Sequence, residues 1–275
     1  MLKYQELPAA IGRCLQGRTR GLLQRILRFP KGAYSIIELS SACRLQDAGI
    51  YGIVRPVLKR LKRERLLGDE PSMDIVLATR NRKKVEEIRR ITAGLPIMVL
   101  SLDNFPECPE TVEDRDTFEG NAVKKATEVA HCTGKPALAD DSGLVVDALG
   151  GRPGVLSARY APDASSGNDP RNYEKVLKDL RPYSGADRTA RFVCCIALAF
   201  PDGQVRTFFG YAEGRIAPEP RGQKGFGYDP VFIPQGYEST FAEMRPEEKD
   251  GLSHRGKALE KLSEFLLSFS KHKEN

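Results

Sequence analysis

Two adjacent carboxylates, Asp140 and Asp141, lie at the end of a short apolar run that begins at Pro136. Neighbouring residues of a regular strand point to opposite faces, so both carboxylates reach one site only where the strand ends and the chain turns. Ser142 and Gly143 follow directly and are typical turn residues. Close carboxylates repel each other unless a cation or a proton lies between them. The pair therefore predicts either a Mg²⁺ site that shares ligands with substrate phosphates or an ordinary surface turn.

A polar loop, residues 79–84, follows an apolar run at residues 74–78 and precedes a segment with helical spacing of its apolar side chains. The backbone N–H groups and the dipole at the start of a helix favour a bound anion. Thr79, Asn81 and Lys84 can add side-chain donors to phosphate oxygens. The Gly-x-x-x-x-Gly-Lys-Ser/Thr pattern of a P-loop is absent. A capped loop exposed to solvent is the alternative interpretation.

A glycine-rich loop with two aromatic residues spans residues 222–230. Glycine lets the backbone approach a ligand closely, and an aromatic ring is a platform for stacking a base. A tight turn with buried aromatic side chains is the alternative. Further along the chain, Lys249, Ser253, His254 and Arg255 form a cluster of hydrogen-bond donors at the start of a helix. These two segments are the candidates for nucleoside binding.

The elements that must position these groups alternate between strands and helices, which favours an α/β fold. The expected strands are residues 74–78, 95–100, 136–141, 189–200 and 205–214. The expected helices are residues 85–91, 117–132, 168–180 and 258–269. The last two strands read as an antiparallel pair, so the sheet should be mixed. An acidic loop, residues 106–116, leads into the helix that Thr117 should cap.

The composition fits a globular protein with reduced cysteines. The chain has 275 residues, of which 40% are hydrophobic. No apolar run approaches the roughly 18 residues of a membrane span, and arginines interrupt the apolar parts of the N-terminus, which argues against a secretory signal. The six cysteines include no Cys-x-x-Cys pair. We therefore expect a cytoplasmic protein whose thiols are reduced and which does not contact a membrane.

The first 72 residues differ from the rest in charge. They hold 14 Lys/Arg and 6 Asp/Glu, a net of +8, whereas residues 73–275 have a net of −2. We divide the chain into a basic helical domain at residues 1–68, a linker at residues 69–72 and a second domain at residues 73–275. Three helices with a basic third one resemble the helix-turn-helix and winged-helix class of DNA-binding modules. A solvated basic surface, or an extension upstream of a true start at Met73, are the alternatives.

Seven short motifs follow one another between Met73 and about Phe269, and seven in series make coincidence a poor explanation. They are Thr79-x-Asn81-x-x-Lys84, Glu113-x-x-x-Thr117-Phe118-x-x-Asn121-Ala122, Ala139-Asp-Asp-Ser-Gly-Leu144, Leu149-Gly-Gly-x-Pro-Gly154, Ser157-Ala-Arg159-Tyr160, Gly225-Phe-Gly-Tyr-Asp-Pro230 and Ser253-His-Arg255. In combination they resemble the inosine/xanthosine triphosphate pyrophosphatase family, whose house-cleaning members hydrolyse deaminated purine nucleoside triphosphates to the monophosphate and pyrophosphate. The resemblance implies an elongated mixed sheet flanked by helices in two lobes, an active-site cleft between them, bound Mg²⁺ and a homodimer.

The resemblance also implies roles for the matching residues. Thr79, Arg80, Asn81, Arg82, Lys83 and Lys84 would hold the triphosphate, and Ser142 would contact phosphate. Glu113, Asp140 and Asp141 would surround Mg²⁺, with Asp141 as the general base. Phe226, Gly227, Tyr228 and Asp229 would orient the nucleoside, and Lys249, His254 and Arg255 would contact the base. Arg80 and Arg115 depart from the resemblance, because many members have glycine at these places.

The 6-oxygen of inosine and xanthosine accepts a hydrogen bond, whereas the amino group of adenine donates one. Arg255 and a protonated histidine offer donors only, so the sequence predicts rejection of ATP. This argument does not explain rejection of GTP, because guanine also has the 6-oxygen. Two other functions fit the sequence. One is a nucleotide-sensing DNA-binding regulator, and the other is a related house-cleaning pyrophosphatase for another modified or a pyrimidine nucleotide.

Overall fold

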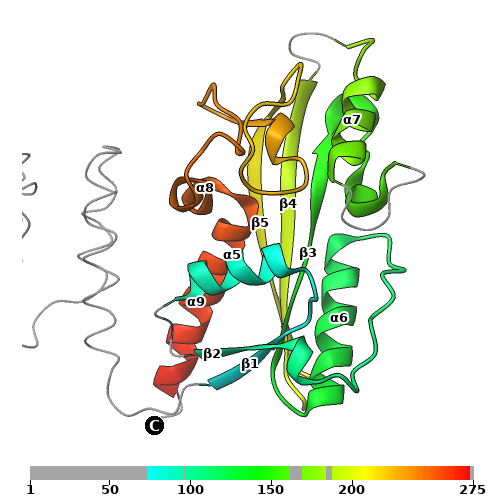
Figure 1. The fold of residues 1–275 in the computed structure, drawn as a ribbon. Helices are drawn as coiled ribbons and strands as arrows, with labels where there is room; N and C mark the ends of the chain where they lie inside the picture. Colours follow the sequence, from blue (N-terminus) through cyan, green and yellow to red (C-terminus); the bar gives the residue numbers. More distant parts are fainter. Residues whose placement is uncertain (1–72, 94, 96, 162–168, 184–187, 273–275) are drawn as a thin grey trace, which may run out of the picture. The chain divides into compact units, whose positions relative to one another are not determined.

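The computed structural model describes residues 73–272, apart from residues 94, 96, 162–168 and 184–187 (Figure 1). The helical domain expected at residues 1–68 and its linker at residues 69–72 lie outside the described residues, so both stay predictions. Within the part of the chain that the structure describes, no helix has the length and apolar character that a bilayer span requires.

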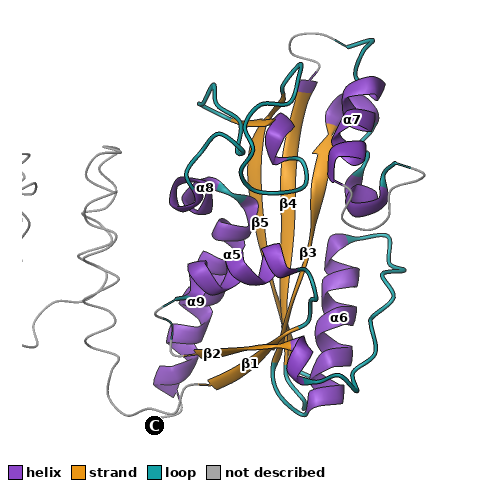
Figure 2. Ribbon diagram, in the orientation of Figure 1, coloured by secondary structure: helices purple, strands orange, loops and turns teal. Residues whose placement is uncertain are grey.

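A six-stranded mixed sheet forms the centre of the described region (Figure 2). Its spatial order is β2-β1-β3-β4-β5-β6, in which β1 pairs in parallel with β2 and β3 and all later pairs are antiparallel. The strands are β1 (Met73–Leu77), β2 (Ile97–Ser101), β3 (Ala137–Val146), β4 (Thr189–Ala199), β5 (Val205–Ile216) and β6 (Phe232–Pro234). The mixed sheet is thus confirmed, and the short edge strand β6 is an addition to the five expected strands.

Helices flank the sheet on both faces (Figure 1). They are α5 (Arg82–Thr92), α6 (Phe118–Thr133), α7 (Asp169–Asp179), α8 (Pro246–Leu252) and α9 (His254–His272). Short 3₁₀ turns occupy Leu102–Asn104, Asp147–Leu149, Gly154–Arg159 and Asp229–Val231. The helices expected at residues 85–91, 117–132, 168–180 and 258–269 are confirmed within the described residues, although α5 and α9 begin earlier. α9 begins earlier because the Ser253 hydroxyl accepts a hydrogen bond from the backbone N–H of Gly256 and caps the helix.

The alternation of side chains along β3 decides which helix covers which face. Ala137 and Ala139 pack in one apolar cluster with residues of α6. Leu138, between them, packs in another cluster with residues of α5 and α9. Because side chains alternate along a strand, Asp141 lies on the α6 side of β3 and Asp140 on the opposite side.

The expected turn at Ser142–Gly143 is wrong. β3 continues through both residues to Val146, and Ser142 and Gly143 pair with Cys194 and Val193 of β4. A side chain at position 143 would collide with Ser157 and with the carbonyl of Gly154, so glycine is needed here for close packing and not for a turn. The two aspartates therefore face different surroundings.

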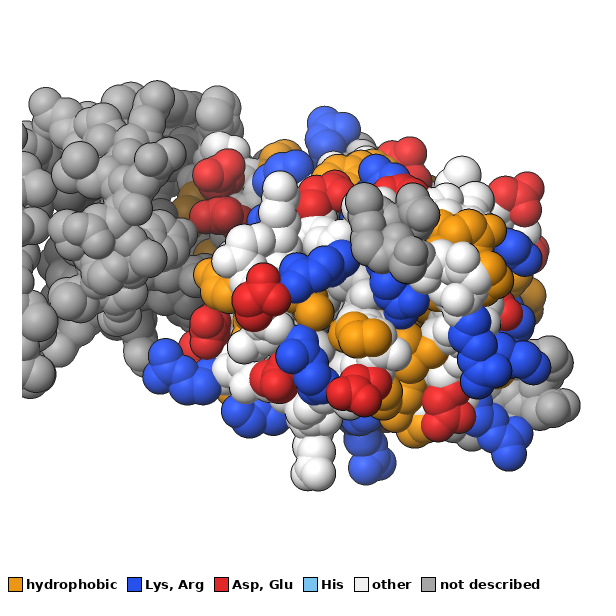
Figure 3. All heavy atoms as spheres, turned by 90° about the horizontal axis from the view of Figure 1, so that it is seen from above, with side chains coloured by type: hydrophobic (Ala, Val, Ile, Leu, Met, Phe, Trp, Pro, Cys, Tyr) orange, Lys and Arg blue, Asp and Glu red, His pale blue; other side chains and the backbone are white. Residues whose placement is uncertain are grey.

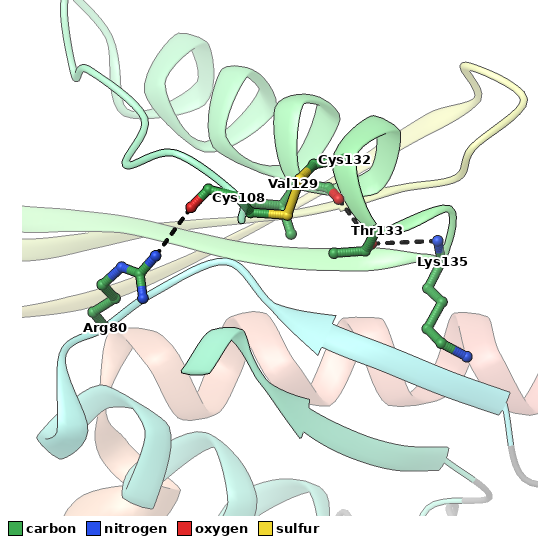
Figure 4. Close-up of a disulfide and its surroundings, with 6 residues drawn as sticks. All are labelled: Arg80, Cys108, Val129, Cys132, Thr133 and Lys135. Carbon is green, nitrogen blue, oxygen red and sulfur yellow. Dashed lines mark hydrogen bonds between the residues drawn. A yellow bond between two sulfur atoms is a disulfide. The ribbon is translucent and has the colours of Figure 1, made fainter. Parts of the chain in front are cut away.

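The expectation of reduced thiols is wrong for two of the cysteines. Cys108 of the acidic loop forms a disulfide with Cys132 of α6, with 5.8 Å between their Cα atoms (Figure 4). Cys194 and Cys195 are free and buried in β4. The acidic loop is thus covalently joined to α6.

Charge is nearly balanced over the region from residue 73 onward, which holds 29 Lys/Arg and 31 Asp/Glu. On the face drawn in Figure 3, basic and acidic side chains are interspersed rather than gathered by sign. On this face, therefore, the described residues form no broad patch of one sign.

The N-cap of α6 gives a stability prediction. The Thr117 hydroxyl accepts a hydrogen bond of 3.0 Å from the backbone N–H of Gly120. Thr117→Ala should lower the free energy of unfolding by about 1 kcal/mol, because that N–H loses its partner. Thr117→Ser keeps the hydroxyl and is the matched control. Urea unfolding of the three proteins measures the effect, and equal stability of the alanine and serine variants would contradict it.

Candidate active site

A cleft of about 610 Å³ gathers nearly all of the side chains that the sequence analysis selected. Its lining includes residues 79–84, Glu113, Asp141 and Ser142. It also includes residues 226–229, Lys249, His254 and Arg255. Of the predicted site residues only Asp140 is missing from the lining, because Arg255, Lys84 and Ser142 cover it and it is 1% exposed. The cleft has the size of a site for a small organic ligand.

The polar loop is shorter than the sequence suggested, because α5 already begins at Arg82. Asn81 is the N-cap, and its side chain accepts hydrogen bonds from the backbone N–H groups of Lys83 at 3.1 Å and Lys84 at 3.3 Å. The Thr79 hydroxyl in turn accepts from the backbone N–H of Asn81. Since Asn81 occupies two of the N–H groups of the first turn, the basic side chains of this segment are the main positive groups for an anion.

Asp141 lies in a pair of carboxylates joined by one ammonium group. The Nζ of Lys125 lies 3.0 Å from an oxygen of Asp141 and 2.7 Å from an oxygen of Glu113. Asn121 donates to the other oxygen of Asp141 at 3.3 Å. Burial raises the pKa of Asp141 above its ordinary value, and the positive charges of Lys125 and Lys84 offset part of that rise. A carboxylate with a raised pKa is a better proton acceptor than an exposed one.

Asp140 belongs to a separate, buried network. Arg255 donates through Nε to one of its oxygens at 2.9 Å, and Lys84 Nζ lies 2.5 Å from the other. The Ser142 hydroxyl donates to the same oxygen as Lys84 at 2.8 Å. Burial alone would raise the pKa of Asp140, but Arg255 and Lys84 outweigh it and hold the pKa well below the usual range. Both oxygens of Asp140 are thus engaged by the protein itself.

Glu87 of α5 completes this buried network. It accepts a hydrogen bond from Nη1 of Arg255 and lies 2.8 Å from Nζ of Lys249, which also contacts Asp229 at 2.6 Å. Burial would raise the pKa of Glu87, but Arg255 and Lys249 lower it to about 2. Arg255 is only 2% exposed, so its guanidinium joins α9 to β3 and α5. Its predicted contact with a base has to be made by whatever part of its edge remains open to the cleft.

Three residues of the site were not given a role by the sequence analysis: Glu87, Asn121 and Lys125. Asn121 and Lys125 are four residues apart and therefore share one face of α6, which is a sequence signal for a common site. A carboxylate next to Ile88 on the buried side of an amphipathic helix is the corresponding signal for Glu87, since buried charges are almost always paired.

The glycine-rich loop places one aromatic ring among cations. The Phe226 ring has Lys249 Nζ 5.1 Å and Arg255 Cζ 5.5 Å from its centroid. Tyr228 is buried and donates its hydroxyl to the carbonyl of Ser157, and Asp229 accepts from the backbone N–H of Phe226. The structure therefore shows Tyr228 and Asp229 shaping the loop, while Phe226 is the ring best placed to pack on a nucleoside.

His254 carries an unpaired polar atom. Its ring stacks on Phe192 with centroids 4.6 Å apart, and Nδ1 is buried without a hydrogen-bond partner. Burial and the positive charge of Arg255 hold the pKa of His254 well below its usual value. The imidazole is therefore neutral at pH 7, which differs from the protonated histidine considered in the sequence analysis. A neutral imidazole donates at one nitrogen and accepts at the other.

The donor set fits a magnesium ion that is shared with a substrate. Among the described residues, no group of three His, Cys, Asp or Glu side chains lies close enough to hold a metal ion by itself. Glu113 and Asp141 are nevertheless close enough to contact the same ammonium nitrogen, so a cation between them is already favourable. Mg²⁺ is commonly held by one or two carboxylates together with substrate phosphates. These two residues suit such a site better than Asp140.

Comparisons with known proteins cover the described region. Residues 75–265 match the Ham1 family. The dITP/XTP pyrophosphatase of Geobacter sulfurreducens is 51% identical over 192 residues, which are 70% of this chain and 96% of that protein. The dITP/XTP pyrophosphatase of Bacillus subtilis is 46% identical over 193 residues, 70% of this chain and 96% of that one. A HAM1 protein structure from Coxiella burnetii has a TM-score of 0.66 at 42% identity and covers 71% of this chain and 99% of its own.

The lowered pKa of Glu87 gives a prediction about acid stability. A carboxyl whose pKa falls from 4.5 to about 2 on folding stabilises the protein above pH 4.5, and that contribution disappears as the pH falls towards 2. Its size is on the order of 3 kcal/mol. Glu87→Gln should therefore unfold more easily than the wild type at pH 7, with a difference that shrinks on acidification.

Glu86→Gln is the matched control, because Glu86 is the exposed neighbour of Glu87 on α5. Urea unfolding of the three proteins between pH 7 and pH 3 makes the comparison. A difference between wild type and Glu87→Gln that does not change with pH would show that the carboxylate is not ionised by its partners.

Proposed function

The chain belongs to the Ham1 family, and we propose that it hydrolyses deaminated purine nucleoside triphosphates, ITP/dITP and XTP/dXTP, to the monophosphate and pyrophosphate. This activity is the one named for its dITP/XTP pyrophosphatase relatives. The observation that carries the chemistry is the position of Asp141: a buried carboxylate with a raised pKa lines the same cleft as the basic segment at residues 79–84. By removing such nucleotides the protein would keep them out of DNA and RNA.

The basic segment neutralises and orients the triphosphate. A bound triphosphate carries about four negative charges, and its transfer chemistry depends mainly on position and charge stabilisation. Lys84 lies against Asp140 at the floor of the segment, whereas Lys83 is largely exposed at its rim. Thr79 and Asn81 fix the turn from which these side chains project. The α-phosphorus is then open to in-line attack from the side of Asp141.

Asp141 takes the proton of the attacking water. Lys125 and Asn121 hold its carboxylate in place, so the proton acceptor does not have to be ordered during the reaction. Lys125 also contacts Glu113, which keeps the two carboxylates together despite their repulsion. Glu113 and Asp141 would hold Mg²⁺, which supplies neutralisation of charge on the phosphate oxygens and on the leaving pyrophosphate. Ser142 lines the cleft next to Asp141, and its hydroxyl, which donates to Asp140 in the structure, would have to leave that bond to donate to a phosphate oxygen.

Phe226 and His254 are the residues that meet the nucleoside. The Phe226 ring offers a stacking surface, and His254 lines the cleft with a buried Nδ1 that has no hydrogen-bond partner among the described residues, so a bound base could supply one. With its proton on Nδ1, the neutral imidazole can donate a hydrogen bond to a 6-oxygen. It cannot do so to adenine, whose 6-amino group is itself a donor. An unpaired donor of this kind costs roughly 1–3 kcal/mol, which favours ITP over ATP.

Three further properties belong to this proposal. The resemblance implies a homodimer, which light scattering of the purified chain tests. The composition favours a cytoplasmic protein, which cell fractionation tests. DNA contact through residues 1–68 is tested by gel shift on genomic fragments, with and without residues 1–72. A DNA-binding nucleotide sensor would shift the fragments without releasing pyrophosphate.

Asp141→Asn should abolish hydrolysis of ITP while the fold is kept, because an amide cannot accept the proton of water. A loss of at least about 10²-fold in the rate of pyrophosphate release is expected. The matched control is Asp147→Asn, which changes an exposed aspartate beyond the end of β3 and should leave the rate unchanged. Near-normal turnover by Asp141→Asn would remove this residue from the role of base.

His254→Ala should reduce the preference for ITP over ATP, because the donor that distinguishes the two bases is lost. The ratio of kcat/KM for the two nucleotides should fall about tenfold, which corresponds to 1.4 kcal/mol. His131→Ala, on the exposed side of α6, is the control. An unchanged ratio in His254→Ala would place base recognition elsewhere in the cleft.

A further inference from the structure

The acidic loop is fastened to α6 at two separate points. At its far end, Asn121 pairs with the backbone of Arg115 at 2.9 and 3.2 Å, and Lys124 donates to the carbonyl of Val112 at 2.8 Å. At its near end, the Cys108–Cys132 disulfide makes the connection (Figure 4). Residues 109–111, between the two fastenings, line the cleft. Residues 109–111 thus form a wall of the cleft between Cys108 and Glu113. The disulfide fixes the end of this wall at Cys108.

The disulfide end of the acidic loop contacts the basic segment, residues 79–84, directly. The carbonyl of Cys108 accepts a hydrogen bond of 3.1 Å from Nη2 of Arg80 (Figure 4). The other terminal nitrogen of Arg80 lies 3.8 Å from Asp103, a long contact between exposed groups that contributes little. The Arg80 side chain is 40% exposed and lines the cleft. Its position at the cleft thus depends mainly on where the Cys108 carbonyl is held.

We propose that the Cys108–Cys132 disulfide is a redox-sensitive strap that positions Arg80 for the triphosphate, so that the state of this bond sets nucleotide affinity. The inference rests on the proposed function, since it concerns the same cleft. With the strap closed, Arg80 is held at the cleft by its hydrogen bond to the Cys108 carbonyl. With the strap open, the Cys108 carbonyl is no longer covalently tied to α6 and is held by core packing and by the backbone hydrogen bond from Cys108 to Phe105, so the acceptor of Arg80 is less firmly fixed. Lost preorganisation lowers affinity without removing any group that reacts.

The chemistry of opening is a thiol–disulfide exchange with a dithiol. Cys132 is an exposed residue, whereas Cys108 is buried. A thiolate of the dithiol therefore attacks the sulfur of Cys132, and the S–S bond breaks with its electron pair on the Cys108 sulfur. The second thiol of the reagent then displaces Cys132. The protein gains two electrons and two protons as two thiols, and the dithiol becomes a cyclic disulfide.

The strap should act on binding and not on the chemical step. Asp141 is held by Lys125 and Asn121, and Glu113 is held by Lys125, at the far fastening. None of these contacts involves Cys108 or Arg80. Opening the strap should therefore raise KM and leave kcat unchanged, whereas a general loosening of the site would raise KM and also lower kcat.

The test is steady-state hydrolysis of ITP by the full chain, oxidised and after treatment with dithiothreitol. Reduction should raise KM about three- to tenfold at constant kcat, the effect expected of one lost positioning contact. Cys132→Ser should show the raised KM in both conditions and no response to dithiothreitol, which shows that other cysteines are not involved. Arg80→Ala should also raise KM, and reduction should add nothing further. His131→Ala is the control for a substitution at this end of α6.

An oxidised and a reduced protein with the same KM, when thiol titration shows that the bond has been opened, would overturn the strap. A fall in kcat on reduction would also overturn it, since the bond would then act on the whole site. Absence of ITP hydrolysis in both states would instead contradict the proposed function. In that event calorimetric titration with ITP measures the dissociation constant directly, and the strap still requires weaker binding after reduction and in Arg80→Ala.

Discussion

Asp140 and Asp141 are adjacent in sequence but face opposite sides of β3, and each needs its own buried cation. A buried carboxylate is costly unless it is paired and hydrogen-bonded. Asp140 is paired with Arg255 and Lys84, and Asp141 with Lys125. The cations come from α9, α5 and α6. The two buried aspartates are therefore paired only when these helices pack on the sheet. The same packing places the side chains of the site.

Because the two aspartates lie on opposite sides of β3, their environments also differ. On one side, Arg255 and Glu87 hold Asp140 ionised in a rigid network that ties three elements together. On the other side, Asp141 keeps a raised pKa in a cleft open to substrate. The environments of these identical side chains shift their pKa values in opposite directions, which suits Asp140 to a structural anchor and Asp141 to the proton acceptor proposed above.

Local sequence signals predicted much of the fold. Thr117 caps α6 and Gly134 ends it with a positive φ of 64°, as local chemistry dictates. The turn at Ser142–Gly143 was wrong because pairing with β4, about fifty residues away, overrides the local preference of these residues. The disulfide could not be predicted either, since Cys108 and Cys132 come together only when the acidic loop folds back on α6. The site followed the same division: motifs led to the residues of the cleft, whereas Lys125 and Glu87 acquire partners only through the packing of helices on the sheet.

The central claim is that Asp140 and Asp141 titrate as two distinct groups, and carbon-13 NMR of the two carboxyl groups as a function of pH measures it directly. With the protein labelled at aspartate and the two signals assigned, the account predicts that Asp141 takes up a proton at a pH above the ordinary pKa of an aspartate. Asp140 should remain ionised to a far lower pH. Two signals that titrate together as one coupled pair would show that the aspartates share a single site, and the account would be wrong.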